Sequence, residues 1–341
     1  MTTLKENDYI LLRRALSIVV FSLYILQLSY LYLNTRIVDF DSLEFIKFFG
    51  PISLLLIFTT LNRIGQEVFV KFMVFTLYAH IAIALIFLSF NFTDSITSDN
   101  RLVLSILGRS PGATAQIFCV ALVVYDYYLK DRILGFNNLG KIIKALFIVI
   151  VLLTQARTYY IFLIFYFLIN HWNIFRNSVK LLRVYFFTTL AGVIIYLSGI
   201  ADEIFERSLG DRLFSGRESI WEAFFNNIFS RGDGQILFGS DLSRHLITVS
   251  KISYETSDVH NTFLDILNYY GLVFLLLFLF WYIFSSGFFR SKKSFTILVS
   301  YFPVLMLSAV FKFPFAFYSS LLILLLPIYF NNIRHSEKET L

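Results

Sequence analysis

Charged residues and cysteine are scarce in this chain, and their scarcity excludes several classes of protein. Only 15% of the residues are charged whereas 57% are hydrophobic, which is far from the balance of a soluble globular domain. The single cysteine, Cys119, lies in a hydrophobic stretch, so no intramolecular disulfide can form and cysteine usage does not indicate a redox compartment. Walker loops, dinucleotide-binding glycine motifs and Cys/His zinc spacings are absent. The composition therefore predicts a polytopic membrane protein.

The net charge of +6 would suit a nucleic-acid-binding protein, but the distribution of the cations does not. Lysine and arginine lie in short segments between apolar runs, where they orient a membrane protein and attract anionic headgroups. We therefore expect membrane lipid as a partner, and no nucleic acid. The first apolar run, 17–33, has no small-residue cleavage site and is expected to be a retained helix.

Apolar runs that approach the length of a membrane span recur along the whole chain. We expect an all-α polytopic fold with about ten transmembrane helices, in which residues 1–341 form a single integral membrane domain. The sequence has no convincing internal repeat and no Pro/Ser-rich linker that would mark a second domain. The expected spans are 15–33, 44–60, 70–91, 112–129, 141–155, 157–170, 183–200, 262–286, 295–311 and 315–331.

Residues 141–170 could form one overlong helix or two short helices that meet around Thr154–Thr158. With two helices, six Lys/Arg clusters fall on one side of the membrane: Lys5/Arg13/Arg14, Arg63/Lys71, Lys130/Arg132/Lys141/Lys144, Arg176/Lys180/Arg183, Arg290/Lys292/Lys293 and Arg334/Lys338. The positive-inside rule favours this arrangement, with both termini cytoplasmic. It places 201–261, a long loop between spans seven and eight, outside the cytoplasm together with the shorter loops 34–43, 92–111 and 156–158.

The long loop contains a segment with the pattern of an amphipathic helix. Apolar side chains recur there at helical spacing, opposite Glu218, Glu222, Asn226 and Asn227, which suits a helix lying on the membrane surface. The apolar set is Ile220, Trp221, Phe224, Phe225, Ile228 and Phe229.

A polar block at 258–265 precedes the eighth expected span, and His260 and Asn261 are its candidates for chemistry. The imidazole of His260 can take a proton from an attacking hydroxyl near neutral pH, and Asn261 can orient a sugar. The alternative is structural: Asp258 or Asn261 caps the following helix while His260 only faces the headgroups.

Three arginines on the expected outer side are candidates for binding phosphate. Guanidinium groups bind phosphate oxygens bidentately, which suits Arg212 and Arg217 to a pyrophosphate, although local pairing with Asp211 or Glu218 is an equal alternative. Arg157 interrupts a hydrophobic hairpin, where an arginine costs about 2.5–3.5 kcal/mol even on permissive insertion scales. Such a residue usually faces a cavity or a partner, and the alternative is that it extends to the outer headgroups.

An acidic cluster in the first outer loop contains Asp39, Asp41 and Glu44. Two carboxylates at this spacing could hold a divalent cation, but in a short loop we interpret them as a solvated segment and expect no metal site.

Other polar and aromatic residues have simpler interpretations. His80, in the middle of the third expected span, is interpreted as a hydrogen-bonded buried histidine, and no spacing argument assigns a role to His245. Tyr159 and Tyr160 are expected in the interfacial aromatic belt.

The order of these motifs resembles the O-antigen polymerase and ligase superfamily, which includes the Wzy-type polymerases. The resemblance rests on Arg157 in a tight outward hairpin, on Ser215-Gly216-Arg217 with Trp221, and on the block from His260 to Leu267 that leads to Gly271. It covers roughly 141–290. It implies a membrane-embedded glycosyltransferase of GT-C-like architecture that inverts configuration, needs no metal or other cofactor, and uses glycans carried on undecaprenyl pyrophosphate.

The resemblance also implies roles by position. His260 would be the base that activates the acceptor hydroxyl, Arg157 and Arg217 would hold the pyrophosphate, and Arg212 would support them or contact a sugar. Trp221 would stack on a sugar or anchor the loop helix. The substrates would be a lipid-linked donor and acceptor at the periplasmic face of the bacterial inner membrane, with a chain-length regulator and a repeat-unit flippase as partners.

Four functions remain open at this point. We favour a polymerase over a ligase that transfers the chain to the lipid A core, because no enlarged basic outer surface for a phosphorylated core is evident. A transporter or flippase for the lipid-linked repeat is less favoured, because the polar residues gather at one face and related halves are not visible. A non-catalytic assembly or chain-length partner is the fourth hypothesis.

Overall fold

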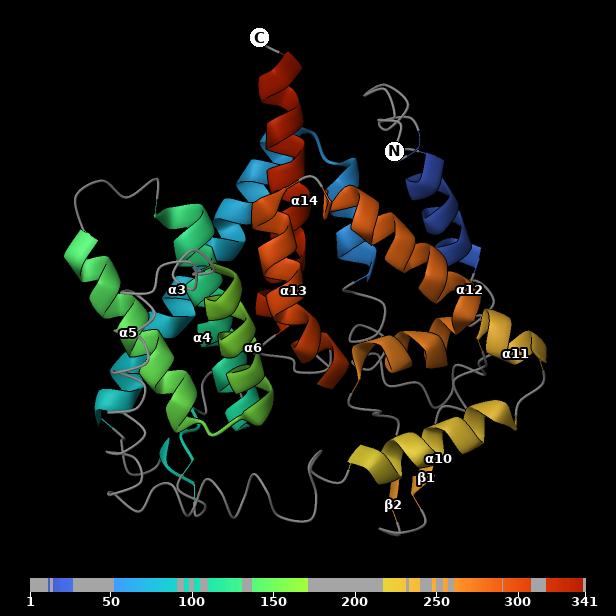
Figure 1. Cartoon of the computed structure of the whole chain (residues 1–341), viewed down its shortest axis with the longest axis horizontal. Helices are drawn as coiled ribbons and strands as arrows, with labels where there is room; N and C mark the ends of the chain where they lie inside the picture. Colours follow the sequence, from blue (N-terminus) through green and yellow to red (C-terminus); the bar gives the residue numbers. More distant parts are fainter. Residues whose placement is uncertain are drawn as a thin grey trace, which may run out of the picture.

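The computed structural model is almost entirely helical (Figure 1). It describes residues 12, 15–26, 52–90, 95–97, 101–104, 110–130, 137–170, 217–230, 233–239, 247–249, 254–256, 261–289, 291–307 and 317–339. Two short strands, β1 (Ile247–Val249) and β2 (Tyr254–Thr256), form an antiparallel hairpin with Thr248 opposite Glu255. The predicted helical class is therefore confirmed over the described residues, apart from this hairpin.

The helices follow one another closely along the described part of the chain. Unlabelled helices occupy 15–26 and 52–60. The labelled helices are α3 (Arg63–Phe90), α4 (Pro111–Val124), the π-helix η3 (Tyr125–Leu129), α5 (Asn137–Leu153), α6 (Arg157–Asn170), α10 (Arg217–Phe229), α11 (Asp233–Phe238), α12 (Thr262–Ser285), α13 (Lys292–Leu307) and α14 (Phe317–Glu339).

Three of the described helices are long and apolar enough to cross a membrane: Arg63–Phe90, Pro111–Leu129 and Thr262–Ser285. Shorter apolar helices occupy Ala15–Leu26, Arg157–Asn170 and Tyr318–Ile333. These helices support a membrane protein. The count of ten spans and the glycosyltransferase architecture stay predictions, and the expected span 183–200 lies outside the described residues.

Residues 141–170 form two helices, as the positions of the cations predicted. A turn separates α5 from α6, and Gln155 adopts a left-handed backbone conformation there (φ 51°). The Thr154 hydroxyl donates to the Val151 carbonyl (2.7 Å), which satisfies one of the acceptors that the end of α5 leaves open.

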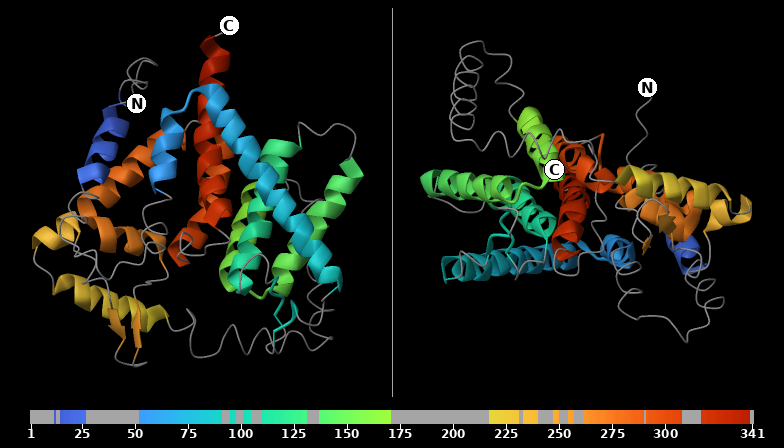
Figure 2. Two further views of the ribbon diagram at one scale, coloured as in Figure 1. Left: turned by 180° about the vertical axis from the view of Figure 1, so that it is seen from behind. Right: turned by 90° about the horizontal axis from the view of Figure 1, so that it is seen from below.

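Successive helices run in alternating directions, so the polar ends of the bundle differ in character (Figures 1 and 2). The starts of α3, α5 and α13 and the end of α14 lie together at one end, which we call the basic end. The turn between α5 and α6, the start of α12 and the whole of α10 lie at the opposite end, which we call the loop end. This grouping of helix ends agrees with the predicted arrangement of the Lys/Arg clusters.

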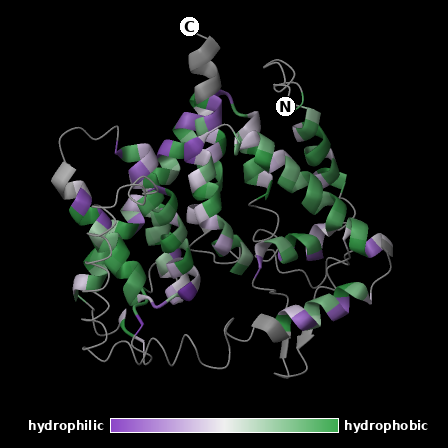
Figure 3. Cartoon of the chain, in the orientation of Figure 1, coloured by the Kyte–Doolittle hydropathy of each residue, from purple (hydrophilic) through white to green (hydrophobic). Residues whose placement is uncertain are grey.

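The centre of the bundle is formed by helices that are buried on all sides. Residues 113–124 of α4 and residues 319–329 of α14 are buried throughout, which is the pattern of a core helix. By contrast, α3 exposes large apolar side chains, among them Phe72 (63%) and Phe75 (73%). Outer helices with apolar surfaces (Figure 3) suit contact with lipid tails rather than water.

The eighth expected span is not a continuous helix. Gly271 has non-helical backbone angles (φ 79°, ψ 172°), so α12 consists of two helices that meet at a sharp kink. The first part, up to Tyr270, packs with α11 near α10, and the second part rises toward the basic end (Figure 1). A Cβ at Gly271 would lie 2.4 Å from the Gly239 nitrogen and 2.4 Å from the Leu237 carbonyl oxygen. Glycine is therefore required by both backbone conformation and close approach.

The amphipathic helix predicted in the long loop is confirmed as α10. Its buried side chains Ile220, Phe224 and Ile228 pack against partly buried residues of α11 and α12, whereas Phe229 is 73% exposed. The helix thus uses one apolar face to hold the start of α12. Its location on a membrane surface stays a prediction.

Candidate functional site at the loop end

Arg157 is the first residue of α6 and its side chain is partly buried. The chain turns sharply just before Arg157, so this residue lies at the tip of the α5–α6 hairpin rather than within a span. The predicted hairpin with Arg157 at its tip is confirmed, and its outward orientation stays a prediction. This position places a guanidinium group at the loop end, beside the backbone amides of the first turn of α6, where anions are favoured.

Asn261 caps α12. Its side-chain oxygen accepts hydrogen bonds from the backbone nitrogens of Phe263 (3.0 Å) and Leu264 (3.1 Å), and the residue is only 4% exposed. The structural alternative from the sequence is therefore confirmed for Asn261. Because the oxygen already accepts two hydrogen bonds, it is not free to accept a bond from a sugar hydroxyl.

The long-loop residues of the predicted site are described only in part. Arg217 is the first residue of α10, which brings its backbone to the loop end, but its side chain lies outside the described part of the structure. Trp221 is half-buried and packs beside Ile220, Phe224 and Ile228, so it anchors α10 whether or not it also meets a sugar.

Several predicted residues fall outside the described residues: His260, Arg212, His245, Asp39, Asp41 and Glu44. His260 directly precedes Asn261 in the chain. Within the described residues, no three His, Cys, Asp or Glu side chains group closely enough to hold a metal ion.

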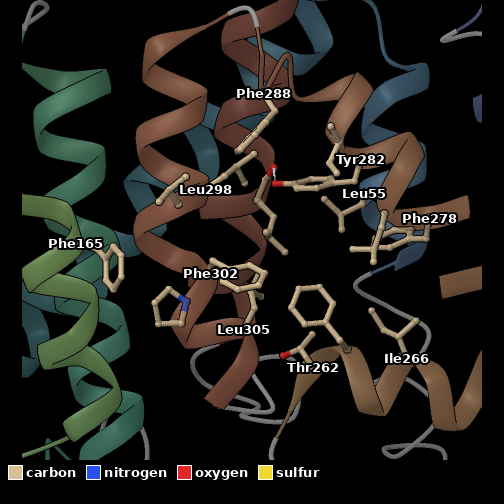
Figure 4. A pocket seen from close by; sticks show the side chains of 16 residues that line it. Leu55, Phe165, Thr262, Ile266, Phe278, Tyr282, Phe288, Leu298, Phe302 and Leu305 are labelled. Carbon is tan, nitrogen blue, oxygen red and sulfur yellow. Dashed lines mark hydrogen bonds between the residues drawn. The ribbon is translucent and has the colours of Figure 1, made fainter. Parts of the chain in front are cut away.

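An apolar cavity of about 360 Å³ begins at the start of α12 (Figure 4). It lies between α12, α13 and α14, with Phe165 of α6 on its far side, and its lining is almost entirely hydrocarbon. Thr262 lines it next to the capping residue. Phe302 (51%) and Phe165 (40%) line the cavity and are exposed, so the cavity is not fully enclosed. Such a cavity suits a long apolar chain that enters from the membrane.

Tyr159 is not in the aromatic belt, contrary to the prediction. It is 2% exposed, and its hydroxyl donates to the Gln116 side chain of α4 (2.9 Å). The Gln116 amide in turn donates to Ser319 (3.2 Å) and Ser320 of α14. Polar side chains buried in a membrane must satisfy one another, and this network joins α4, α6 and α14. Tyr160 is partly buried and donates to the Leu152 carbonyl oxygen (2.6 Å).

The interpretation of His80 holds in part. Its Nδ1 lies 3.0 Å from the Thr76 carbonyl oxygen, and its ring stacks on Tyr318 with centroids 5.1 Å apart, but the residue is only partly buried.

Arg101 is a basic residue of the loop end that the sequence interpretation missed. The short segment that carries it is fastened to the end of α5, because the Leu102 nitrogen donates to the Leu153 carbonyl oxygen (3.0 Å). A signal was available: Arg101 lies in an expected outer loop, in a chain whose other cations cluster mainly in inner loops.

A second polar cluster lies at the basic end. Asp126 of η3 forms a salt bridge with Lys144 of α5 and accepts a hydrogen bond from the Tyr166 hydroxyl of α6. The neighbouring Tyr127 hydroxyl bonds the Asn170 side chain. The cluster therefore fastens three helices at the end opposite the candidate site.

No protein-family model matches this chain, and no curated protein or solved structure matches it.

Proposed function

We propose that this chain polymerises undecaprenyl-pyrophosphate-linked repeat units into O-antigen or a related surface polysaccharide at the periplasmic face of the bacterial inner membrane. The observation that carries the proposal is the apolar cavity whose lining begins at Thr262, immediately after Asn261 and His260 in the chain. An isoprenoid tail in this cavity would leave its diphosphate near the loop end. Arg157 lies eight residues before Phe165 of the cavity wall, about 12 Å along α6.

The reaction assigns each side chain a distinct role. The His260 imidazole accepts the proton of an acceptor sugar hydroxyl while that oxygen attacks the anomeric carbon of the donor sugar. The bond between the anomeric carbon and the diphosphate oxygen breaks, and configuration inverts. Arg157, Arg217 and Arg212 balance the charge of the departing undecaprenyl diphosphate.

The kink of α12 supports this arrangement. The segment from Thr262 to Tyr270 packs with α11 near α10 instead of continuing the upper helix, and it presents its capped start next to the cavity. A straight helix through Gly271 would move the start of α12 away from α11 and α10. The kink therefore holds Thr262, two residues after the predicted base in the chain, at the apolar cavity.

The test is complementation of a deletion strain, read on a lipopolysaccharide gel. Wild-type protein is expected to restore the ladder, whereas His260→Ala should reduce polymerisation by about 10²–10⁴-fold and leave a single capped repeat. Arg63→Gln is the matched control, because Arg63 is an exposed arginine at the basic end. Loss of all O-antigen, including the single repeat, in the deletion strain would indicate a ligase. A full ladder from a well-inserted His260→Ala protein would indicate a non-catalytic assembly partner.

A transporter of the lipid-linked repeat is a second candidate, which the break in α12 favours. Discontinuous helices are common at transporter substrate sites. The deletion strain distinguishes the two functions: a transporter predicts lipid-linked repeat accumulating in the cytoplasmic leaflet, and a polymerase predicts single repeats reaching the cell surface.

A further inference from the structure

The segment around Arg101 is fixed against the α5–α6 hairpin by its backbone. It folds back on residues 95–97 through an antiparallel bridge between Ile96 and Leu102, and Val103 donates to the Ser95 carbonyl oxygen (2.8 Å). Two further bonds tie the segment to helices: Leu102 to the Leu153 carbonyl oxygen of α5 (3.0 Å) and the Leu104 nitrogen to the Thr114 hydroxyl of α4 (3.1 Å). The position of Arg101 is therefore determined by the bundle.

The Arg101 side chain holds an unsatisfied donor. Its Nε is buried and has no hydrogen-bond partner among the described residues. Its backbone, by contrast, is fully engaged, since the Thr97 nitrogen donates to the Arg101 carbonyl oxygen (2.9 Å) and the Thr97 hydroxyl accepts from the Arg101 nitrogen (3.2 Å). A buried donor on a charged group is costly to leave without an acceptor, so a bound anion would satisfy it.

Arg101 and Arg157 belong to the same corner of the loop end. Arg157 begins α6, and Tyr160 follows one turn later on the same face of the helix. The Tyr160 hydroxyl bonds the Leu152 carbonyl oxygen at the end of α5, and Leu102, next to Arg101, donates to the adjacent Leu153 carbonyl oxygen. Arg101 and Arg157 are thus carried by segments that meet at the tip of the α5–α6 hairpin, which Figure 2 shows beside the 101–104 segment.

We infer that Arg101 is a further phosphate-binding residue that acts with Arg157, and that together they grip the diphosphate of a lipid-linked glycan. The inference rests on the proposed function for the identity of the ligand. A phospholipid headgroup offers the same phosphate chemistry, and its single phosphate distinguishes it from a diphosphate. Two guanidinium groups match a diphosphate better than a monophosphate, because each can form a bidentate pair with its own phosphoryl group.

The test measures binding to the full-length protein in detergent, with undecaprenyl diphosphate, undecaprenyl monophosphate and phosphatidylglycerol as probes. Arg101→Gln should weaken diphosphate binding by about 10- to 100-fold, the loss expected for one charge-assisted pair. Arg101→Lys should recover part of the affinity, because it restores the charge without the planar fork. Arg63→Gln should change none of the three affinities.

Two outcomes would overturn the inference. One is diphosphate affinity within twofold of wild type in an Arg101→Gln protein that melts at the wild-type temperature. The other is an equal loss for phosphatidylglycerol, which would make the site a general headgroup contact. If Arg101→Gln does not fold, the affinities of the Arg101→Lys protein are used instead. Wild-type affinity for both the diphosphate and the monophosphate would overturn the inference. A loss of affinity for the diphosphate alone would support it. Binding is measured without turnover, so a chain that binds diphosphate through Arg101 but forms no polymer would refute only the proposed function.

Discussion

The two ends of the bundle hold their charges in different ways. At the basic end, Lys144 and Asp126 neutralise each other, with 29% and 14% of their side chains exposed, and Tyr166 adds a hydrogen bond to the same carboxylate. At the loop end, Arg101 forms none of the salt bridges found among the described residues, and its buried Nε has no acceptor there.

This difference separates a structural role from the proposed binding role. A cation that is matched by a carboxylate of its own chain stabilises the helices that carry the two groups, and it has little capacity left for a ligand. A cation that keeps an unsatisfied donor costs stability and retains its capacity for an external anion. The basic end therefore fastens η3, α5 and α6 together, whereas Arg101 at the loop end keeps a donor for an external anion.

The largest loss of stability is expected from a substitution at Gly271, whose kink shapes the loop end and not the basic end. In Gly271→Ala the new Cβ would meet backbone atoms of Leu237 and Gly239 at 2.4 Å, and alanine is strained at a φ of 79°. We expect destabilisation on the order of 3 kcal/mol or more, since neither backbone segment can move without displacing α11. The melting temperature of the purified protein in detergent measures this loss.

Gly234→Ala is the matched control, because a Cβ at Gly234 would meet nothing within 4 Å. This variant, in the helix α11 that packs on α12, should melt within a few degrees of wild type, because the expected change in the free energy of unfolding is below about 1 kcal/mol. Equal melting temperatures for Gly271→Ala and wild type would contradict the kink and the close approach of α11.

A smaller effect is expected at the basic end. Asp126→Asn removes the charge that balances Lys144, and its amide keeps one acceptor oxygen where the carboxylate offered one to the half-buried lysine and one to Tyr166. Because Lys144 keeps some contact with solvent, we expect a loss of about 1–3 kcal/mol, below that of a fully buried pair. Polymerisation per folded molecule should stay at the wild-type value, since the cluster lies opposite the candidate site.

Glu67→Gln provides the control for Asp126→Asn. Glu67 pairs with Lys71 at 2.9 Å on the exposed face of α3, with side chains 36% and 58% exposed. Exposed pairs of this spacing contribute about 0.3–0.5 kcal/mol, so the melting temperature should hardly change. If Asp126→Asn abolishes polymerisation at full stability, the separation between a structural end and a binding end is wrong.

The sequence predicts those features of this fold that depend on neighbouring residues. Charge placement divided 141–170 into two helices, and the spacing of Ile220, Phe224 and Ile228 located α10 with its buried face. The capping alternative for Asn261 also followed from residue type and position alone. Each of these signals is local, within about two turns of a helix.

Features that depend on distant contacts were not predictable. Gly271 lies in a strongly apolar run whose pattern predicts one continuous helix. The kink depends on the backbone of Leu237 and Gly239, more than thirty residues earlier in the chain. Tyr159 has an aromatic-belt position in the sequence, yet its partner Gln116 lies 43 residues away on α4. The outer-loop position of Arg101 is visible in the sequence, but the bond that its neighbour Leu102 donates to Leu153, which fixes the segment against the hairpin, is not revealed by any spacing rule.

The smallest expected effect concerns Asn261, where the loop end combines a structural role with a predicted binding role. Asn261→Ala removes the acceptor for Phe263 and Leu264 and should cost about 1 kcal/mol, whereas Asn261→Ser keeps a capping oxygen and should stay within a few tenths of wild type. Melting temperatures of the two variants measure the cap, and polymer length on a lipopolysaccharide gel measures the site. If Asn261 caps the helix and does not contact a sugar, Asn261→Ser should preserve both the melting temperature and the polymer length. If serine preserves the melting temperature but shortens the polymer as much as alanine does, the buried amide also contacts substrate, and the loop end binds more than phosphate.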